Sequence, residues 1–340
     1  MIKDYINRLM RTTPRHLPDR VFQAGLWLVS FCYRAGIAVW DAFYRTGVLK
    51  RYGAGVPVIS VGNVTVGGSG KTPFTIYLAG RLKKEGRQPA VLIRGYGDDE
   101  WRLAAASLDG IPVIKGADRV AAAGEAVLNH NCDVVILDDG FQHRRLRRDF
   151  NVLLVDSNDP FGNGHLFPRG ILREPLSALR RADAVVLTKS DLGSRNVDCL
   201  KKFFSEKMKI RRVFSGHYRA AGLAGVNDGA DIPLGSLRNA RVTVFSGLAD
   251  PAYFKFMVKK LGAVVEGELD FPDHHPYTAG DVAVITGQAA KSQSWLILTT
   301  EKDAVKVKGL PVPEGAPPVA ALRIEFEPDC QMEDLIAGID

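Results

Sequence analysis

A glycine-rich segment near residue 70 contains the residue types that bind phosphate groups. Glycines let backbone N–H groups approach a phosphate closely, a following lysine reaches the β- and γ-phosphates, and a threonine hydroxyl coordinates Mg²⁺. The chain departs from the general pattern at its first position, where Thr65 stands in place of glycine. The segment predicts a site for a nucleoside triphosphate, whose ligands would be Thr65, Gly67, Gly68, Ser69, Gly70, Lys71 and Thr72.

Two adjacent carboxylates follow an apolar run downstream. Asp138 and Asp139 come directly after Val134–Leu137, which is apolar throughout, as a buried parallel strand is. A carboxylate at the C-terminal end of a strand beside the phosphate-binding loop is placed to support the magnesium ion. We expect this role for one of the two, and an ordinary strand-end role for the other.

Two further segments carry residues that could move a proton. Asp98 and Asp99 follow the apolar segment 90–93. A carboxylate there could accept the proton of a sugar hydroxyl that attacks the γ-phosphate, and a solvated turn is the alternative. His274 and His275 are adjacent, so in an extended chain they point to opposite sides and do not share a metal ion. We expect one of them to contact a substrate.

These residues need a sheet to bring them together. Apolar strands and helices alternate from residue 58 to residue 188. This order predicts an α/β fold with a P-loop NTPase-type doubly wound parallel sheet. Strand, helix and strand patterns between residues 242 and 298 predict a second, smaller α/β domain. We divide the chain into an N-terminal interface-helix region (1–50), a phosphate-loop domain (51–218), a linker hairpin (219–238) and the smaller domain (239–340).

The composition excludes several classes of protein. Of the 340 residues, 46% are hydrophobic, which excludes a disordered or collagen-like chain. The four cysteines lie far apart and form no CxxC pair. This pattern is typical of a reducing compartment and indicates neither a disulfide framework nor a metal site.

Positive charge is concentrated at the N-terminus. The formal net charge is +7, and an excess of five basic side chains lies within the first 50 residues. The apolar window Val21–Trp40 lies among them, and its uncharged part before Arg34 is too short to cross ~30 Å of hydrocarbon as a helix. We expect a helix lying in an anionic membrane interface, packing on the following domain, or doing both with its two faces. We expect no nucleic-acid partner, since the charge is not spread over a reading face.

Together the motifs resemble the tetraacyldisaccharide 4'-kinases of lipid A biosynthesis. The resemblance spans about residues 20–310, and Thr65 is normal at its position in that family. The segments that carry it are Gly62-Asn63, Thr65–Pro73, Arg94–Gly97, Asp138–His143, Phe161–Gly164, Arg173–Leu176, Asp273–His275 and Thr299–Asp303.

The resemblance implies a reaction, a location and an architecture. ATP with Mg²⁺ would phosphorylate the 4'-hydroxyl of an acylated glucosamine disaccharide 1-phosphate, at the cytoplasmic face of the bacterial inner membrane. Two α/β/α domains would be joined by a two-stranded linker. Lys71 and Thr72 would hold the phosphates and Mg²⁺, and Asp138 would support the metal. The catalytic residues would be Asp99 as the base, His274 paired with it across the domain cleft, and Asp139 and Glu174 as active-site acids.

Two of these assignments depend on the register. The family usually has a longer insertion between its R-G-Y-G and G-D-E elements, which here merge in residues 97–100, so Asp98 and Asp99 compete for the role of the base. We choose Asp99 because it directly precedes Glu100, as the family acid precedes its glutamate. We likewise choose His274 over His275.

Two rival functions come from other features. Thr188-Lys189-Ser190-Asp191 resembles the N-K-x-D element with which GTPases bind guanine, so a P-loop GTPase or a metallochaperone-like ATPase is the alternative. A non-enzymatic membrane-binding module built around Val21–Trp40 ranks lower, because it leaves the phosphate-binding loop, Asp138 and His274 unexplained.

Overall fold

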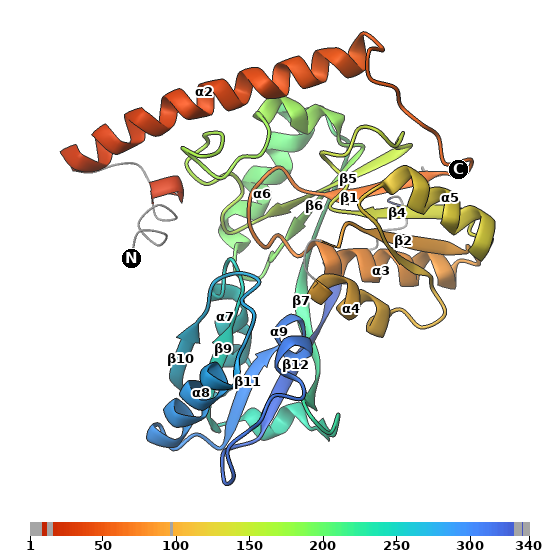
Figure 1. Ribbon diagram of the computed structural model, residues 1–340. Helices are drawn as coiled ribbons and strands as arrows, with labels where there is room; N and C mark the ends of the chain where they lie inside the picture. The colour runs from red at the N-terminus through yellow and green to blue at the C-terminus, as the bar shows by residue number, and fades with distance from the viewer. Residues whose placement is uncertain (1–8, 12–15, 96–97, 330–334, 336–340) are drawn as a thin grey trace.

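The computed structural model describes residues 9–11, 16–95, 98–329 and 335. Tyr96 and Gly97 of the predicted catalytic loop lie outside the described residues, as does the side chain of Asp98. Figure 1 shows one half of the molecule built around a large sheet, with the helix α2 across its outside, and a second half formed by the C-terminal part of the chain.

A parallel sheet forms the first half and places β1 at its centre. The strand order is β3-β2-β4-β1-β5-β6-β7, and all neighbours are parallel. Every residue of β1, β2, β4 and β6 is buried, because helices cover both faces of a parallel sheet. The bounds are β1 Val58–Gly62, β2 Pro89–Ile93, β3 Val113–Lys115, β4 Val134–Asp138, β5 Phe150–Asp156, β6 Ala184–Thr188 and β7 Arg212–Gly225. The predicted α/β class is confirmed.

Helices connect these strands and begin at the edge of the sheet where the strands end. The helix α3 starts directly after the glycine-rich loop, and α4 follows β2. Asp118 caps α5 by accepting hydrogen bonds from the N–H groups of Val120 and Ala121. The bounds are α3 Lys71–Lys84, α4 Asp98–Ser107, α5 Arg119–His130, η1 Leu176–Arg181, α6 Ser194–Lys202 and η2 Phe203–Lys207.

The second half extends the same sheet through β7. Residues 212–215 of β7 pair with β6, whereas residues 216–225 pair with β12 in antiparallel orientation. Beyond β12 the order is β11-β9-β10, all parallel, and β8 pairs with the end of β7. The strands are β8 Asp231–Ile232, β9 Arg241–Ser246, β10 Val264–Asp270, β11 Leu296–Thr300 and β12 Val319–Pro328. The helices are η3 Leu234–Leu237, α7 Ala252–Lys260, α8 Ala279–Lys291 and α9 Glu301–Val307.

The predicted domain boundary at residue 218 falls inside β7. The predicted linker, 219–238, contains the end of β7 together with β8 and η3. The division into domains therefore stays a prediction, with one continuous strand running through its boundary.

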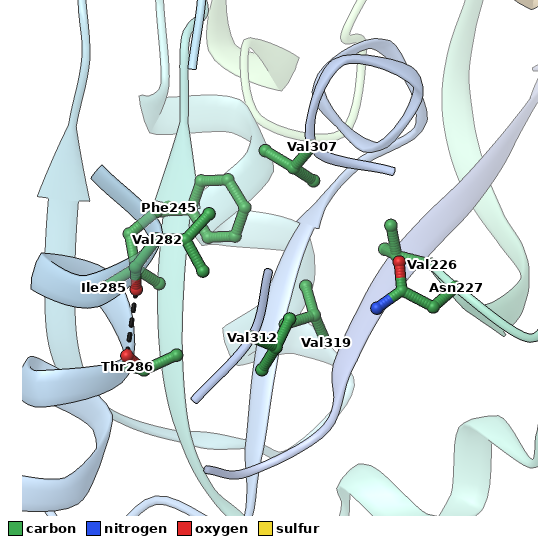
Figure 2. Close-up of a pocket in the computed structure, with 9 residues that line it drawn as sticks. All are labelled: Val226, Asn227, Phe245, Val282, Ile285, Thr286, Val307, Val312 and Val319. Atoms are coloured by element: carbon green, nitrogen blue, oxygen red, sulfur yellow. Dashed lines mark hydrogen bonds between the residues drawn. The ribbon is translucent and has the colours of Figure 1, made fainter. Parts of the chain in front are cut away.

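A small apolar pocket lies within the second half (Figure 2). Its described lining is apolar apart from Asn227 and Thr286. The lining residues are Val226, Asn227, Phe245, Val282, Ile285, Thr286, Val307, Val312 and Val319.

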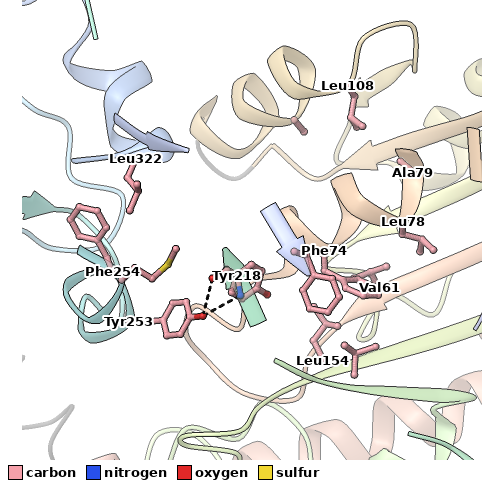
Figure 3. Close-up of a cluster of buried hydrophobic side chains, with 14 of the residues drawn as sticks. Val61, Phe74, Leu78, Ala79, Leu108, Leu154, Tyr218, Tyr253, Phe254 and Leu322 are labelled. Atoms are coloured by element: carbon pink, nitrogen blue, oxygen red, sulfur yellow. Dashed lines mark hydrogen bonds between the residues drawn. The ribbon is translucent and has the colours of Figure 1, made fainter. Parts of the chain in front are cut away.

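Aromatic side chains pack where the two halves meet. Phe74 of α3 is fully buried, and its ring centroid lies 5.0 Å from that of Phe326 in β12. Tyr218 of β7 packs edge-on against Phe326 at 5.7 Å and against Tyr253 of α7 at 5.9 Å. Figure 3 shows Phe74, Tyr218 and Tyr253 in one apolar cluster that continues through both halves. The junction is therefore part of the hydrophobic core.

The helix α2, Leu17–Arg45, turns mainly polar side chains toward the protein and apolar ones outward, the reverse of an ordinary surface helix. Its buried residues are Asp19, Gln23, Ser30 and Tyr44. Large apolar side chains face outward, since Trp27 is 53% exposed and Leu28 is 61% exposed. The helix does pack on the following domain, but through this mainly polar face, while its apolar side chains stay exposed.

Polar contacts attach α2 to the first half. Ser30 Oγ donates to the carbonyl of Leu166 at 3.0 Å, and the Tyr33 hydroxyl donates to the carbonyl of Arg173 at 2.9 Å. Asp41 forms an ion pair with Arg144. In the described part of the chain, α2 alone has the length and composition of a membrane span, and most of that stretch is exposed.

We predict that Phe74→Ala lowers the free energy of unfolding by about 3–5 kcal/mol, because it leaves a cavity between α3 and β12. Urea denaturation would measure the loss, with Val66→Ala as the control, since Val66 is 42% exposed. A loss below about 1 kcal/mol for Phe74→Ala would contradict this packing.

Candidate active site

The glycine-rich loop connects β1 to the N-terminus of α3. Gly70 caps the helix with φ +75°, a left-handed conformation that favours glycine. A Cβ at Gly70 would lie 1.8 Å from the Tyr218 hydroxyl oxygen, so only glycine fits there without a shift. The first N–H groups of α3 have no partner within the helix and point toward the loop. This arrangement is suited to an anion such as a phosphate.

Asp138 lies beside the start of α3 because β4 is the immediate neighbour of β1. Its Oδ2 accepts a hydrogen bond from the Thr72 hydroxyl at 2.9 Å, and its Oδ1 accepts one from Thr75 at 3.1 Å. The side chain is buried, and this burial raises the pKa of Asp138 above its ordinary value although Lys71 opposes the shift. A cation bound at this carboxylate would offset that cost.

Asp139 forms ion pairs with two basic side chains. It has φ +52°, and its carboxylate lies 3.7 Å from Lys71 Nζ and 3.0 Å from an Arg173 nitrogen. Burial raises the pKa of Asp139, but Lys71 and Arg173 outweigh it, so the pKa falls below its ordinary value. Asp139 is therefore ionised and lies beside the lysine of the loop.

Glu174 is held inside a network of donors. Arg181 binds its two oxygens at 2.7 and 2.8 Å, and Arg144 binds at 3.0 Å. Gln142 Nε2 donates to Glu174 Oε1 at 3.1 Å and to the carbonyl of Asn63 at 2.8 Å. The carboxylate is 5% exposed, and the donors outweigh its burial and lower its pKa. These contacts fix the position of Glu174 and of the adjacent Arg173.

Asp99 and His274 lie together, although 175 positions separate them in the chain. His274 Nδ1 is 3.0 Å from Asp99 Oδ2. Lys302 and Lys306 of α9 approach the same oxygen at 3.8 and 3.5 Å. Asp99 is 4% exposed, and burial raises its pKa, but Lys302, His274 and Lys306 outweigh burial and lower it. One carboxylate of the first half thus faces three basic side chains of the second.

Glu100 connects this cluster to the phosphate-binding loop. Burial, followed by the nearby charge of Asp138, raises the pKa of Glu100. Lys302 lies 3.9 Å from it, and Lys71 is close enough to oppose the shift. The Asp99 cluster and the Asp138 cluster therefore form one charged site.

The comparisons with known proteins agree with the geometry. A sequence profile of the family "Tetraacyldisaccharide-1-P 4'-kinase" matches residues 22–339. The tetraacyldisaccharide 4'-kinase of Anaeromyxobacter sp. (strain Fw109-5) is 41% identical, with 91% of this chain and 88% of that protein aligned. That of Syntrophus aciditrophicus (strain SB) is 38% identical, with 92% and 91% aligned. The chain belongs to the tetraacyldisaccharide 4'-kinase family.

A solved structure supports the same assignment. The crystal structure of LpxK from Aquifex aeolicus, in complex with ATP, has a TM-score of 0.73 and 33% sequence identity. The alignment covers 94% of this chain and 98% of that one. The resemblance inferred from the motifs is therefore confirmed, and the membrane-module interpretation without an enzyme activity is wrong.

The guanine-binding interpretation has no support in this family member. The Asp191 carboxylate, which would bind the base, accepts a hydrogen bond from Tyr253 at 2.9 Å and from Lys260 at 2.9 Å. Lys189 is buried and pairs with Asp156 and Asp250. The element therefore forms contacts inside the protein.

The structure brings most of the predicted site residues together. The phosphate-binding loop, Asp138, Asp139, Asp99 and His274 lie along the carboxyl edge of the first sheet. The role of each residue stays a prediction. His275 points elsewhere and contacts Asp281 at 3.1 Å.

Lys302 and Lys306 are site residues that had no predicted role. Lys302 lies within the Thr299–Asp303 motif, which matched the family without an assigned role, whereas Lys306 lies outside it. Only the packing of α9 against α4 shows that these lysines reach Asp99.

We predict a pH-dependent contribution of Glu174 to stability. The pKa of Glu174 is lower in the folded protein than its ordinary value of 4.5. The ionised side chain therefore stabilises the fold fully above pH 4.5, and this stabilisation is lost as the pH falls below that value. At neutral pH, Glu174→Gln should lower the free energy of unfolding by about 3 kcal/mol, because Arg181 loses the carboxylate it pairs with and Arg144 keeps only Asp41.

Chemical denaturation across a pH series would measure the difference between the two proteins. Glu325→Gln is the control, because Glu325 is 57% exposed in its pair with Arg219. A difference that stays constant as the pH falls below 4.5 would disprove the linkage.

Proposed function

We propose that this protein transfers the γ-phosphate of ATP to the 4'-hydroxyl of a tetraacylated glucosamine disaccharide 1-phosphate. The observation that carries the proposal is the convergence of two groups at one edge of the sheet. The phosphate-binding loop lies beside Asp138, and Asp99 faces it from α4 with His274 of the second half. The names of the relatives supply the substrate, and the ATP complex of the Aquifex aeolicus protein supports the nucleotide.

The loop residues would bind the nucleotide. The backbone N–H groups of residues 67–72 would cradle the phosphates, and Lys71 would neutralise the negative charge that develops on them. The Ser69 hydroxyl is buried without a hydrogen-bond partner among the described residues, as expected of a group whose partner is a ligand.

The residues present fit a magnesium ion. Thr72 and Asp138 offer hard oxygen atoms, and the burial of Asp138 favours a cation beside it. No cluster of three or more metal-binding side chains occurs among the described residues. This agrees with Mg²⁺, which uses one or two protein ligands together with phosphate oxygens and water. When bound, the ion would stabilise charge on the phosphates.

Asp99 would act as the general base. Its carboxylate would accept the proton of the 4'-hydroxyl while that oxygen forms its bond to the γ-phosphorus, and the bond from that phosphorus to the β,γ-bridging oxygen would break. The lowered pKa of Asp99 keeps the carboxylate ionised at neutral pH. His274 would orient it through the 3.0 Å contact.

Asp139 and Glu174 would support the charges of the site. Asp139 would position Lys71, with which it forms an ion pair. Glu174 was predicted as an active-site acid, and its full set of donors favours a positioning role for it next to Arg173.

The helix α2 would hold the enzyme on its lipid substrate. Its outward apolar side chains and the basic N-terminal region suit an anionic leaflet, which we propose is the cytoplasmic face of the inner membrane. The polar contacts of Ser30 and Tyr33 would keep the site next to that surface.

Transfer of labelled γ-phosphate to the purified disaccharide 1-phosphate lipid in detergent tests the proposal. We expect a labelled bisphosphorylated lipid in the presence of Mg²⁺ and ATP, and much less with GTP. Folded protein that forms no labelled lipid would overturn the proposed function.

We predict that Asp99→Asn lowers kcat by about 100-fold or more while the KM for ATP changes little, because the base contributes to the transition state and not to nucleotide binding. Asp98→Asn is the matched control and should retain most of the activity. The opposite pattern would assign the base to Asp98.

A further inference from the structure

The Thr188–Asp191 element lies directly beneath the phosphate-binding loop. The Thr188 hydroxyl donates to the carbonyl of Ser69 at 3.2 Å and lies 3.4 Å from the carbonyl of Val155. Thr188 is completely buried at the end of β6. A residue of the element that resembled a guanine-binding motif thus contacts the backbone of the loop instead.

Tyr218 of β7 reaches the Ser69 carbonyl as well, together with that of Gly70. Its hydroxyl lies 3.0 Å from the carbonyl of Gly70 and 3.5 Å from that of Ser69, and donates to them. The side chain is 3% exposed. Two hydroxyl groups on adjacent strands therefore hold consecutive carbonyls of the loop.

Holding these carbonyls determines where the loop N–H groups point. In a trans peptide the C=O and the following N–H point in opposite directions. The Ser69 carbonyl turned toward Thr188 therefore directs the Gly70 N–H away from β6. The Gly70 carbonyl accepts from the Phe74 N–H of α3 and from Tyr218, and it thereby directs the Lys71 N–H away from Tyr218. Both N–H groups are then available to a phosphate on the open side of the loop.

The second half of the molecule fixes Tyr218 in place. Its backbone N–H donates to the Tyr253 hydroxyl at 3.1 Å (Figure 3). That hydroxyl in turn donates to Asp191 at 2.9 Å. The ring also packs against Phe326. The tyrosine that contacts the loop thus depends on α7 and β12 for its position.

We propose that Thr188 and Tyr218 are positioning residues that hold the phosphate-binding loop in its anion-binding conformation. The proposal rests on the proposed function, because it assigns the residues to binding of the ATP phosphates. It also gives the Thr188–Asp191 element a role: Thr188 contacts the loop, and Asp191 anchors the Tyr253–Tyr218 pair.

The test is a comparison of the full-length variants Tyr218→Phe and Thr188→Val. Each removes one hydroxyl and keeps the size of the side chain. We expect a rise in the KM for ATP of about three- to tenfold for each, the equivalent of one hydrogen bond. The KM for the lipid should stay unchanged, and kcat should change less than KM for ATP.

Two controls separate positioning from stability. Thr286→Val removes a buried hydroxyl that bonds to the carbonyl of Val282 inside α8, away from the loop. Thermal unfolding with and without Mg²⁺ and ATP gives the shift in Tm on nucleotide binding for every protein. We expect a smaller shift for Tyr218→Phe and Thr188→Val, and the wild-type shift for Thr286→Val.

The outcomes distinguish the two proposals. A wild-type protein whose Tm does not respond to ATP would overturn the proposed function and, with it, the role of the two hydroxyls. A normal wild-type response that both loop variants retain, with unchanged KM for ATP, would overturn only this inference. If Tyr218→Phe does not fold, the KM for ATP and the Tm shift of Thr188→Val test the inference alone.

Discussion

The site depends on one strand that belongs to both halves of the molecule. β7 begins beside β6 in the parallel sheet and continues beside β12 in the second half. The hydrogen bonds to β6 and to β12 lie on consecutive stretches of this one strand, so β7 joins the two halves directly. Aromatic packing around Phe74, Tyr218 and Phe326 fills the space beside it. Residues more than 170 positions apart, such as Asp99 and His274, can therefore meet in a defined geometry.

Charge compensation is the second constraint on the site. Asp138 and Asp99 are both nearly buried, yet their pKa values move in opposite directions. Burial of Asp138 outweighs its one nearby lysine, Lys71, and its hydroxyl donors, whereas the two lysines and the histidine that face Asp99 outweigh its burial. This contrast supports the roles we propose for them, Asp138 beside a bound cation and Asp99 as an ionised proton acceptor.

The local features of the site could be predicted from the sequence. Strand, glycine-rich turn and helix follow one another within about 25 residues, and local propensity and the phosphate-binding pattern identify such a unit. The order of the motifs also identified the family. Lys302 and Lys306 could not be placed in this way, because a surface lysine and one that reaches across a junction look alike in a sequence. Thr188 and Tyr218 could not be placed either, because their hydroxyls contact a loop more than 100 positions away in the chain.

By itself the sequence determined the α/β class, the phosphate-binding loop, the apolar N-terminal helix and the family, because each depends on short-range pattern or on motif order. The tertiary structure decided which face of α2 is exposed, which histidine meets Asp99, and which side chains support the loop. The physical reason is that these outcomes depend on long-range packing. Gln23 and Ser30 face inward only because backbone carbonyls of other segments accept their hydrogen bonds. His274 meets Asp99 only because β7 carries the chain from one half to the other.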